Sequence, residues 1–291
     1  MTLPTPNRYS YSPIHARPDY SWPDGRRLAM YIAVNIEHFS YEHDDAGEPG
    51  VLAWGLHDYG NRVGVWRLLE LLDELSLPAA ALVNTSIYDY APEVPAAFRD
   101  RGDEIVGHGA TNSQRIGVLD AEAERSLLTE VTDSLTVHEG VRPQGWLSPF
   151  LSESDRTLDL LAELGYRYVL DWRMDDQPVA LRTDHGDILA VPYARELVDK
   201  IAVEMRHVSA ADYADMITDT FDEMLLQAES GPLVGCISVH PYVIGQPHRL
   251  HHLRRALSHL TSSPGPVWWT TPGAIAQHVT ENELVEAAVS P

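Results

Sequence analysis

The sequence predicts a single α/β domain, a closed or nearly closed β/α barrel in which parallel strands alternate with helices. Short continuous apolar runs alternate with segments of helical periodicity from residue 28 onward in this chain of 291 residues. Most of the apolar runs end in polar side chains, and no change in composition marks a second domain. We therefore expect a barrel over residues 25–291, preceded by an extended arm over residues 1–24.

The composition excludes several classes of partner. The chain has 43 acidic and 21 basic residues, for a formal net charge of −22. Such a field repels phosphate backbones and anionic lipid, so we expect no nucleic-acid and no membrane partner. A single cysteine, Cys236, excludes an internal disulfide framework and a multi-cysteine metal site. No window approaches the roughly 18 apolar residues of a membrane span, and the N-terminus lacks a signal pattern, which predicts a cytoplasmic protein.

The arm contains prolines and aromatic residues without any period. The segment from Tyr9 to Trp22 carries more apolar area than a free tail would expose. We therefore expect the arm to cover a surface, either of its own barrel or of a neighbouring subunit, and we expect a homo-oligomer.

The first half of the chain shows the alternation clearly. Residues 28–34 form a continuous apolar run, which is typical of a strand buried on both faces, and residues 79–83 form a second. Between them, residues 63–75 have the apolar spacing of a helix, and a loop is expected over residues 40–60 because they are rich in Gly, Asp and Pro. The elements that follow are a helix over 94–101, a strand over 104–106 and a helix over 120–138.

The second half continues the same pattern. A helix over residues 154–164 ends before Gly165, a residue that suits the left-handed conformation after a helix. Ser209 is a suitable N-cap for a long helix that extends to about residue 229. The remaining expected elements are strands over 168–170, 188–191, 233–239 and 267–269 and helices over 248–260 and 272–279.

Polar residues with chemical capability collect where the apolar runs end. In β/α barrels the loops after the strands converge on one face, which holds the active site. Each polar residue alone is compatible with a structural role, but together they predict a shared site. No dinucleotide-binding loop and no Gly-x-Ser-x-Gly nucleophile motif is present. The polar strand ends are Asn35, Glu37, Asn84, His108, Asp171 and His240.

These strand ends resemble the motifs of the polysaccharide deacetylase superfamily. That family ends its first strand in two aspartates, a general base and a metal ligand, and here the sequence Asn-Ile-Glu-His places Glu37 in the base position. The family's metal-binding histidine pair, four residues apart, corresponds to His108 and Asn112. Its third motif has an arginine where this chain has Leu147, and the general-acid histidine of its last motif matches His240. The resemblance implies a distorted (β/α) barrel of the polysaccharide deacetylase type.

The departures from the metal-binding pattern resemble a narrower branch of the superfamily. A zinc site needs at least three good protein ligands, and an asparagine amide is a poor substitute for an imidazole. The chain resembles the metal-independent allantoinases and cyclic imide hydrolases, above all over residues 58–66, 142–146 and 240–247. Residues 107–113 and 175–178 look more like the imide hydrolases. This branch implies no cofactor, with Zn²⁺ as the alternative, no metal ligand, and a tetramer.

The predicted reaction is the hydrolytic opening of a small cyclic imide or ureide at a C–N bond. Glu37 would accept the proton of the attacking water, His108 would orient that water or share the base role, and His240 would donate to the ring nitrogen. An asparagine would donate a hydrogen bond to the developing oxyanion. The substrate-binding candidates are Asn35, Arg62, Asn84, Asn112, Trp146, Trp172 and Tyr242.

Three other functions are compatible with the same residues. The first is a metal-dependent polysaccharide or peptidoglycan N-deacetylase, which calls for an export signal, an open groove and a second metal histidine. The second is an allantoinase. The third is a catalytically inactive binding protein on the same barrel, although such a protein has no need of the acid and the base that Glu37, His108 and His240 would supply.

Overall fold

The strands form one curled sheet, as the sequence predicts. The computed structural model describes residues 5–41, 50–263 and 265–286. The strands follow the order β6-β7-β5-β4-β3-β2-β1-β8, and β9 pairs with β1 as well. Neighbouring strands run parallel, apart from β6, which is antiparallel to β7. The bounds are β1 (Leu28–Ile36), β2 (Ala80–Val83), β3 (Glu104–Gly107), β4 (Gly145–Trp146), β5 (Tyr168–Val169), β6 (Val179–Leu181), β7 (Ile188–Ala190), β8 (Leu233–Val239) and β9 (Val267–Trp269).

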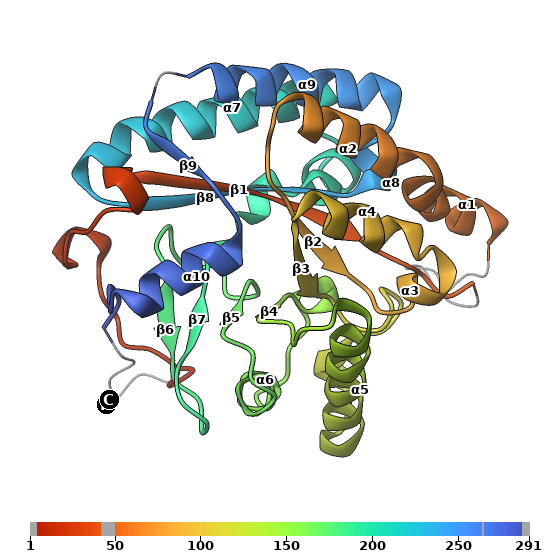
Figure 1. The fold of residues 1–291 in the computed structure, drawn as a ribbon, viewed down its shortest axis with the longest axis horizontal. Coiled ribbons are helices and arrows are strands. Elements are labelled where there is room, and N and C mark those ends of the chain that lie inside the picture. Colours follow the sequence, from red (N-terminus) through yellow and green to blue (C-terminus); the bar gives the residue numbers. More distant parts are fainter. Residues whose placement is uncertain (1–4, 42–49, 264, 287–291) are drawn as a thin grey trace.

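Helices cover the outside of this sheet. Figure 1 shows α7 and α9 side by side above the central strands β1 and β8, with α5 and α6 on the opposite side of the molecule. Within the part of the chain that the structure describes, no helix is long and apolar enough to cross a membrane. The bounds are α1 (Val51–Tyr59), α2 (Val65–Glu74), α3 (Ile87–Tyr90), α4 (Glu93–Arg101), α5 (Ala121–Glu139), α6 (Thr157–Glu163), α7 (Ala210–Gln227), α8 (Pro241–Ile244), α9 (Pro247–Ser262) and α10 (Pro272–Glu281).

Strand β1 lies in the middle of the sheet, and all nine of its residues are buried. Successive side chains of a strand point to opposite faces. Met30 and Ile32 therefore pack in the layer between sheet and helices, whereas Tyr31 and Ala33 pack inside the barrel. Burial on both faces explains why the strand is a continuous apolar run.

Two short strands and one helix differ from the expectation. The strands β4 and β6 have two and three residues, too few to produce a recognisable apolar run. Residues 51–59 form helix α1 where a loop was expected, and residues 60–64 continue it as one π-helical turn into α2. Residues 42–49 of the expected loop lie outside the described residues.

The described part of the arm crosses the outside of its own barrel. Arg8 pairs with Asp159 of α6 at 2.7 Å, and Arg17 pairs with Asp175 at 2.5 Å. Trp22 is 1% exposed and donates its indole N–H to the carbonyl of Leu233 at 3.0 Å. Charged and aromatic contacts therefore hold the arm against the barrel that it precedes.

The seam between β7 and β8 positions part of the site. After β7 the chain returns to β8, where Val198 pairs in parallel with Ser238 as an isolated bridge. The next residue, Asp199, is thereby placed beside His240, which follows the end of β8. The seam brings together two segments that are 41 residues apart in the sequence.

Candidate active site

Three of the predicted strand-end residues meet at one carboxylate oxygen. Glu37 Oε1 lies 3.6 Å from His108 Nε2 and 3.4 Å from His240 Nε2. These side chains follow β1, β3 and β8, whose carboxyl ends meet at the same edge of the curled sheet. All three residues are at most 5% exposed. The structure thus brings together the predicted catalytic set and encloses it.

His240 is held by a carboxylate that the sequence analysis did not identify. Its Nδ1 lies 2.6 Å from Asp199 Oδ1, and its backbone N–H donates to Asp199 Oδ2 at 2.8 Å. Because a carboxylate only accepts, Nδ1 carries a proton and Nε2 faces Glu37. Asp199 therefore fixes both the position and the tautomer of His240.

The buried charges of Glu37 and His240 support each other. Burial alone would raise the pKa of Glu37, but the charges of His240 and Lys200 and the hydrogen bond from His240 outweigh burial and hold this pKa well below its ordinary value. Burial would likewise lower the pKa of His240, yet Glu37 and Asp199 raise it to about 9. At neutral pH the site therefore contains an ionised Glu37 beside a protonated His240.

His108 has a different partner and a different protonation pattern. Its Nδ1 lies 2.7 Å from the backbone carbonyl oxygen of Leu147. Because a carbonyl only accepts, Nδ1 carries the proton in the neutral ring and Nε2 carries a lone pair. This Nε2 is buried and has no hydrogen-bond partner among the described residues. His108 thus presents an unused acceptor beside Glu37.

The predicted asparagines have different surroundings. Asn35 donates to Ser238 and to the Val239 carbonyl. Asn84 accepts from the His38 N–H at 2.9 Å and donates to the His108 carbonyl. In contrast, Asn112 is 2% exposed, and its Oδ1 has no partner within the described ranges. Among these three asparagines, Asn112 therefore has a buried acceptor oxygen without a protein partner.

The other binding candidates are dispersed. Tyr242 lies in the cluster and donates its hydroxyl to Glu37 Oε2 at 2.8 Å. Trp146 is fully buried against Tyr166 in the core, with ring centroids 5.5 Å apart. Trp172 packs against Tyr9 of the arm, and the side chain of Arg62 is 73% exposed. The structure does not bring these last three residues to the catalytic cluster.

Lys200 and Phe39 complete the wall of the site, and the sequence analysis singled out neither for it. The Nζ of Lys200 lies 5.2 Å from the ring centroid of Phe39 and 5.5 Å from that of Tyr242. The only signal for Lys200 was its being the single lysine of the chain. Asp199 and Lys200 directly follow the apolar pair Leu197-Val198. Two apolar residues are too short a run to be recognised as a strand, so the polar residues after them could not be recognised as a strand end.

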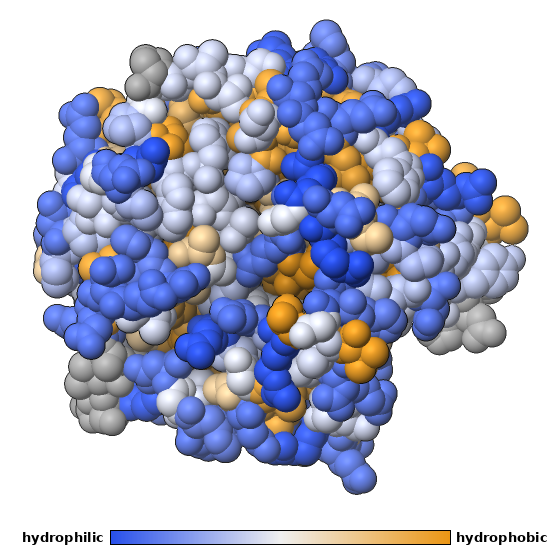
Figure 2. Space-filling model, in the orientation of Figure 1, coloured by the Kyte–Doolittle hydropathy of each residue, from blue (hydrophilic) through white to orange (hydrophobic). Residues whose placement is uncertain are grey.

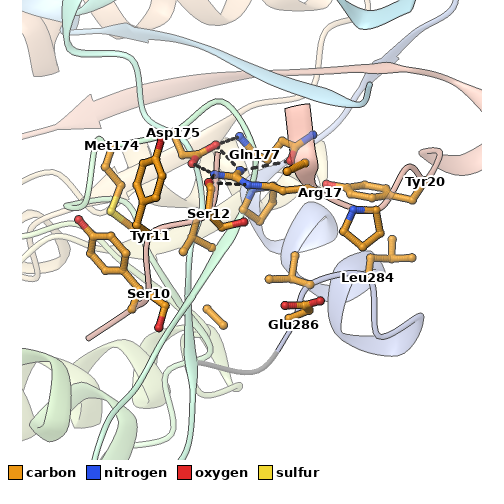
Figure 3. A pocket seen from close by; sticks show the side chains of 17 residues that line it. Ser10, Tyr11, Ser12, Arg17, Tyr20, Met174, Asp175, Gln177, Leu284 and Glu286 are labelled. Carbon is orange, nitrogen blue, oxygen red and sulfur yellow. Dashed lines mark hydrogen bonds and ion pairs between the residues drawn. The ribbon is translucent and has the colours of Figure 1, made fainter. Parts of the chain in front are cut away.

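The space beside the catalytic cluster is small. A cavity of about 10 Å³ adjoins Glu37 and is lined also by Trp54 and Asn61, which is room for about one water molecule. A cavity of about 350 Å³ lies under the arm instead, where Figure 3 shows Arg17 bound to Asp175 and Gln177. A choice of the active site by cavity volume alone would therefore select the space under the arm instead of the space beside Glu37, His108 and His240.

The donor set at the cluster does not match a zinc site. Among the described residues, no group of three or more His, Cys, Asp and Glu side chains could hold a metal ion. His240 is protonated on both nitrogens, and Asn112 stands where the resemblance places the second metal histidine. A zinc ion needs at least three deprotonated protein ligands, which these residues do not supply.

Comparisons with known proteins find similar structures and sequences. The solved structure of Puue allantoinase aligns with a TM-score of 0.83 and 26% identity, over 91% of this chain and 94% of that chain. A Pseudomonas aeruginosa PAO1 structure described as a probable polysaccharide deacetylase has the same fold, with a TM-score of 0.84 and 24% identity over 92% and 96% of the two chains. The peptidoglycan deacetylase of Helicobacter pylori is 23% identical, over 79% of this chain and 87% of its own length.

The family description agrees with the motifs at the strand ends. Residues 52–169 match the polysaccharide deacetylase family, whose members are hydrolases acting on C–N bonds. This range includes His108 and Asn112, and the curled, mostly parallel sheet is the barrel of that family. This part of the chain therefore matches a polysaccharide deacetylase family domain.

Proposed function

We propose that this protein hydrolyses a C–N bond of a small cyclic imide, by acid–base activation of water and without a metal. The observation that carries this proposal is the position of Glu37 Oε1, 3.4 Å from a protonated His240 and 3.6 Å from the bare Nε2 of His108. A base and an acid thus face one point, which is the arrangement that ring opening requires.

The first step is the attack of water on an imide carbonyl. This carbonyl is more electrophilic than that of an ordinary amide, because its nitrogen is shared between two acyl groups. Glu37 accepts one proton of the water while His108 Nε2 accepts a hydrogen bond from the other. A C–O bond forms, and the carbonyl electron pair moves onto oxygen.

We assign the developing oxyanion to the side-chain NH2 group of Asn112, which is the donor end of that amide. Its backbone N–H donates at 2.8 Å to the carbonyl of His38, the residue that follows Glu37, which anchors Asn112 beside the site. Asn35 and Asn84 use their amide groups within the protein. Removal of one such oxyanion donor costs roughly 3–4 kcal/mol in comparable enzymes.

The second step breaks the C–N bond. The electron pair of that bond moves to the ring nitrogen, which takes a proton from His240 Nε2. The proton on Glu37 then passes to His240 across the 3.4 Å that separates them, which restores the starting state. The product is the ring-opened amide acid.

The enclosure of the cluster favours a small substrate. An N-acetylated glycan needs an open groove, whereas Glu37, His108 and His240 are at most 5% exposed and adjoin a cavity of about 10 Å³. Entry of even a small ring therefore requires movement of the covering side chains. Allantoin is the second candidate, because Puue allantoinase has 26% identity and a TM-score of 0.83 with this chain.

A substrate panel tests the proposal. Succinimide, hydantoin, allantoin and an acetylated chitooligomer are incubated with the purified protein, with and without a chelator, and Glu37→Gln is the inactive control. We expect ring opening of the imide to persist after chelation. Release of acetate from the chitooligomer would contradict the cyclic substrate. Loss on chelation with recovery in zinc would contradict the metal-free mechanism.

A further inference from the structure

One peptide group near the site is hydrogen-bonded on both sides. The carbonyl oxygen of Leu147 accepts from His108 Nδ1 at 2.7 Å. The N–H of the same peptide, on Ser148, donates to Asp171 Oδ1 at 2.9 Å and to Oδ2 at 3.1 Å. Leu147, Ser148 and His108 are at most 3% exposed. The peptide thus connects the Asp171 carboxylate to the imidazole in a continuous hydrogen-bonded chain.

Such a connection transmits the electrostatic effect of the Asp171 carboxylate to the His108 ring by polarising the peptide group between them. Hydrogen bonds in a chain polarise one another, and their effect is strengthened where water is excluded. A carboxylate that accepts from the Ser148 N–H draws the peptide toward its dipolar form, and the Leu147 oxygen becomes a stronger acceptor. A stronger acceptor at Nδ1 favours a positive charge on the ring, so that Nε2 becomes a better proton acceptor.

We propose that Asp171 is a positioning residue that acts on His108 through the peptide between Leu147 and Ser148. The inference rests on the proposed function for the role of His108 beside the attacking water. It adds a second carboxylate that supports a histidine of the site. Asp199 contacts His240 directly and holds it as a cation, whereas Asp171 supports His108 through one intervening peptide.

The backbone that holds this peptide is strained. Phe150 and Leu151 have φ values of 60° and 55°, in the left-handed region that side chains rarely adopt. Such conformations cost on the order of 1–3 kcal/mol each and persist only where the surroundings enforce them. The turn is closed by the Leu151 N–H, which donates to the Ser148 carbonyl at 2.8 Å. The strained turn thus keeps the peptide aligned between Asp171 and His108.

The groups that face Asp171 are Glu153, His108 and Arg173. Burial raises the pKa of Asp171 to about 7, while hydrogen bonds from Ser148 and the charges of His108 and Arg173 oppose this rise. Burial, together with Asp171, raises the pKa of Glu153 well above its ordinary value. Asp171 is therefore the member of this acid pair that is ionised above neutral pH, where the connection to His108 is strongest.

The test compares Asp171→Asn with Asp176→Asn, an exposed acid whose side chain takes no part in the site. The asparagine can still accept from the Ser148 N–H, but it carries no charge. We expect kcat on a cyclic imide to fall about 10-fold with little change in KM, which is at the lower end for a residue that supports a ligand or base indirectly. We also expect the Nδ1–H proton resonance of His108 to move upfield. Asp176→Asn should change neither quantity.

The wild-type protein gives a second measurement that does not depend on the folding of a variant. The Ser148 amide resonance and the His108 Nδ1–H resonance should move with one shared midpoint near pH 7. Separate midpoints, or a fall in kcat of Asp171→Asn without a change in the His108 resonance, would overturn the inference. A shift of both resonances in a protein that opens no cyclic amide would support the inference and reject the proposed function.

Discussion

At the scale of single residues, the partner of each side chain decides its chemical role. His108 and His240 are both buried histidines beside Glu37. His240 faces two carboxylates and is therefore a cation, whereas the carbonyl of Leu147 leaves His108 with a bare Nε2. Opposite environments thus make one histidine a proton donor and the other a hydrogen-bond acceptor.

His240 is predicted to act as the general acid. Its removal as His240→Ala would leave two carboxylates in a buried site without their cation, which is destabilising. His240→Gln removes the same charge but keeps a side-chain N–H that can donate to a carboxylate, so it should be the less destabilising of the two variants. We expect kcat to fall by a factor on the order of 10²–10⁴, with a much smaller change in KM, because the proton is needed only in the transition state.

A substrate comparison separates proton donation from binding. An imide with an electron-withdrawing group has a nitrogen that leaves without full protonation, so it should suffer less from His240→Gln. Equal impairment on both substrates would make His240 a binding or structural residue, and the acid would then be sought at His108.

Asp199 is predicted to set the pH range of the acid. Its charge contributes to the rise of the His240 pKa to about 9, together with Glu37. In Asp199→Asn the pKa of His240 should fall, so that the acid loses its proton at lower pH. We expect the alkaline limb of the kcat–pH profile to move to lower pH, which steady-state kinetics between pH 6 and pH 10 can measure. An unmoved limb would show that another group controls it.

The residues of the site could be predicted from the sequence only where they directly follow an apolar run long enough to be recognised as a strand. Glu37, His108 and His240 follow recognisable apolar runs, and the structure places them together. Asp199 follows an isolated bridge rather than a strand, and its role depends on a contact with β8 across 41 residues of sequence. Trp146 could have been a core or a pocket residue from its sequence, and packing against Tyr166 decides for the core.

At the scale of elements, close glycine packing holds the loop after β8. A Cβ on Gly64 would lie 2.0 Å from the Pro241 carbonyl oxygen, and one on Gly245 would lie 2.4 Å from the Gly64 Cα. These glycines belong to the two sequence stretches 58–66 and 240–247. Their contact lets the π-helical turn before α2 approach α8, which begins directly after His240.

Gly64→Ala should therefore damage the site from a distance. The added methyl group meets backbone, which cannot rotate away, and overpacking of this kind costs about 1–3 kcal/mol. We expect a lower melting temperature and a reduced kcat as α8 moves. Gly55→Ala in α1 is the matched control, because a Cβ there meets nothing within 4 Å, and it should stabilise the helix slightly. Similar behaviour of the two variants would contradict this packing role.

The elements that the sequence predicts well are those buried on both faces. Strand β1 and strand β8 are continuous apolar runs because the sheet is covered inside and outside. Strand β4 has only two residues, and it is a strand because it pairs with β3 and β5. Pairing between distant segments leaves no pattern in the local sequence. Helix α1 was missed because glycine and aspartate in residues 40–60 favour a loop, and its packing against α8 overrides that preference.

At the scale of the whole molecule, a strongly negative surface surrounds a buried pair of opposite charges. The face seen in Figure 2 is largely hydrophilic, in keeping with 43 acidic residues and a formal net charge of −22. Surface charges repel one another through water, and salt screens that repulsion with a Debye length of about 8 Å at physiological ionic strength. The pair of Glu37 and His240 lies out of reach of that screening.

These two contributions predict a specific dependence of stability on pH and salt. Because the pKa of His240 is raised to about 9 from 6.5, its stabilising effect is complete below pH 6.5 and is lost as the pH rises through about 9. Surface repulsion grows in the same direction, but 0.5 M NaCl should remove most of it. We expect the free energy of unfolding, from urea titrations, to fall between pH 7 and pH 9 even at high salt. In His240→Gln that residual fall should disappear, since no buried imidazolium remains to lose its proton. If salt abolishes the pH dependence of the wild-type protein, the surface charge alone accounts for it and His240 is not a buried cation.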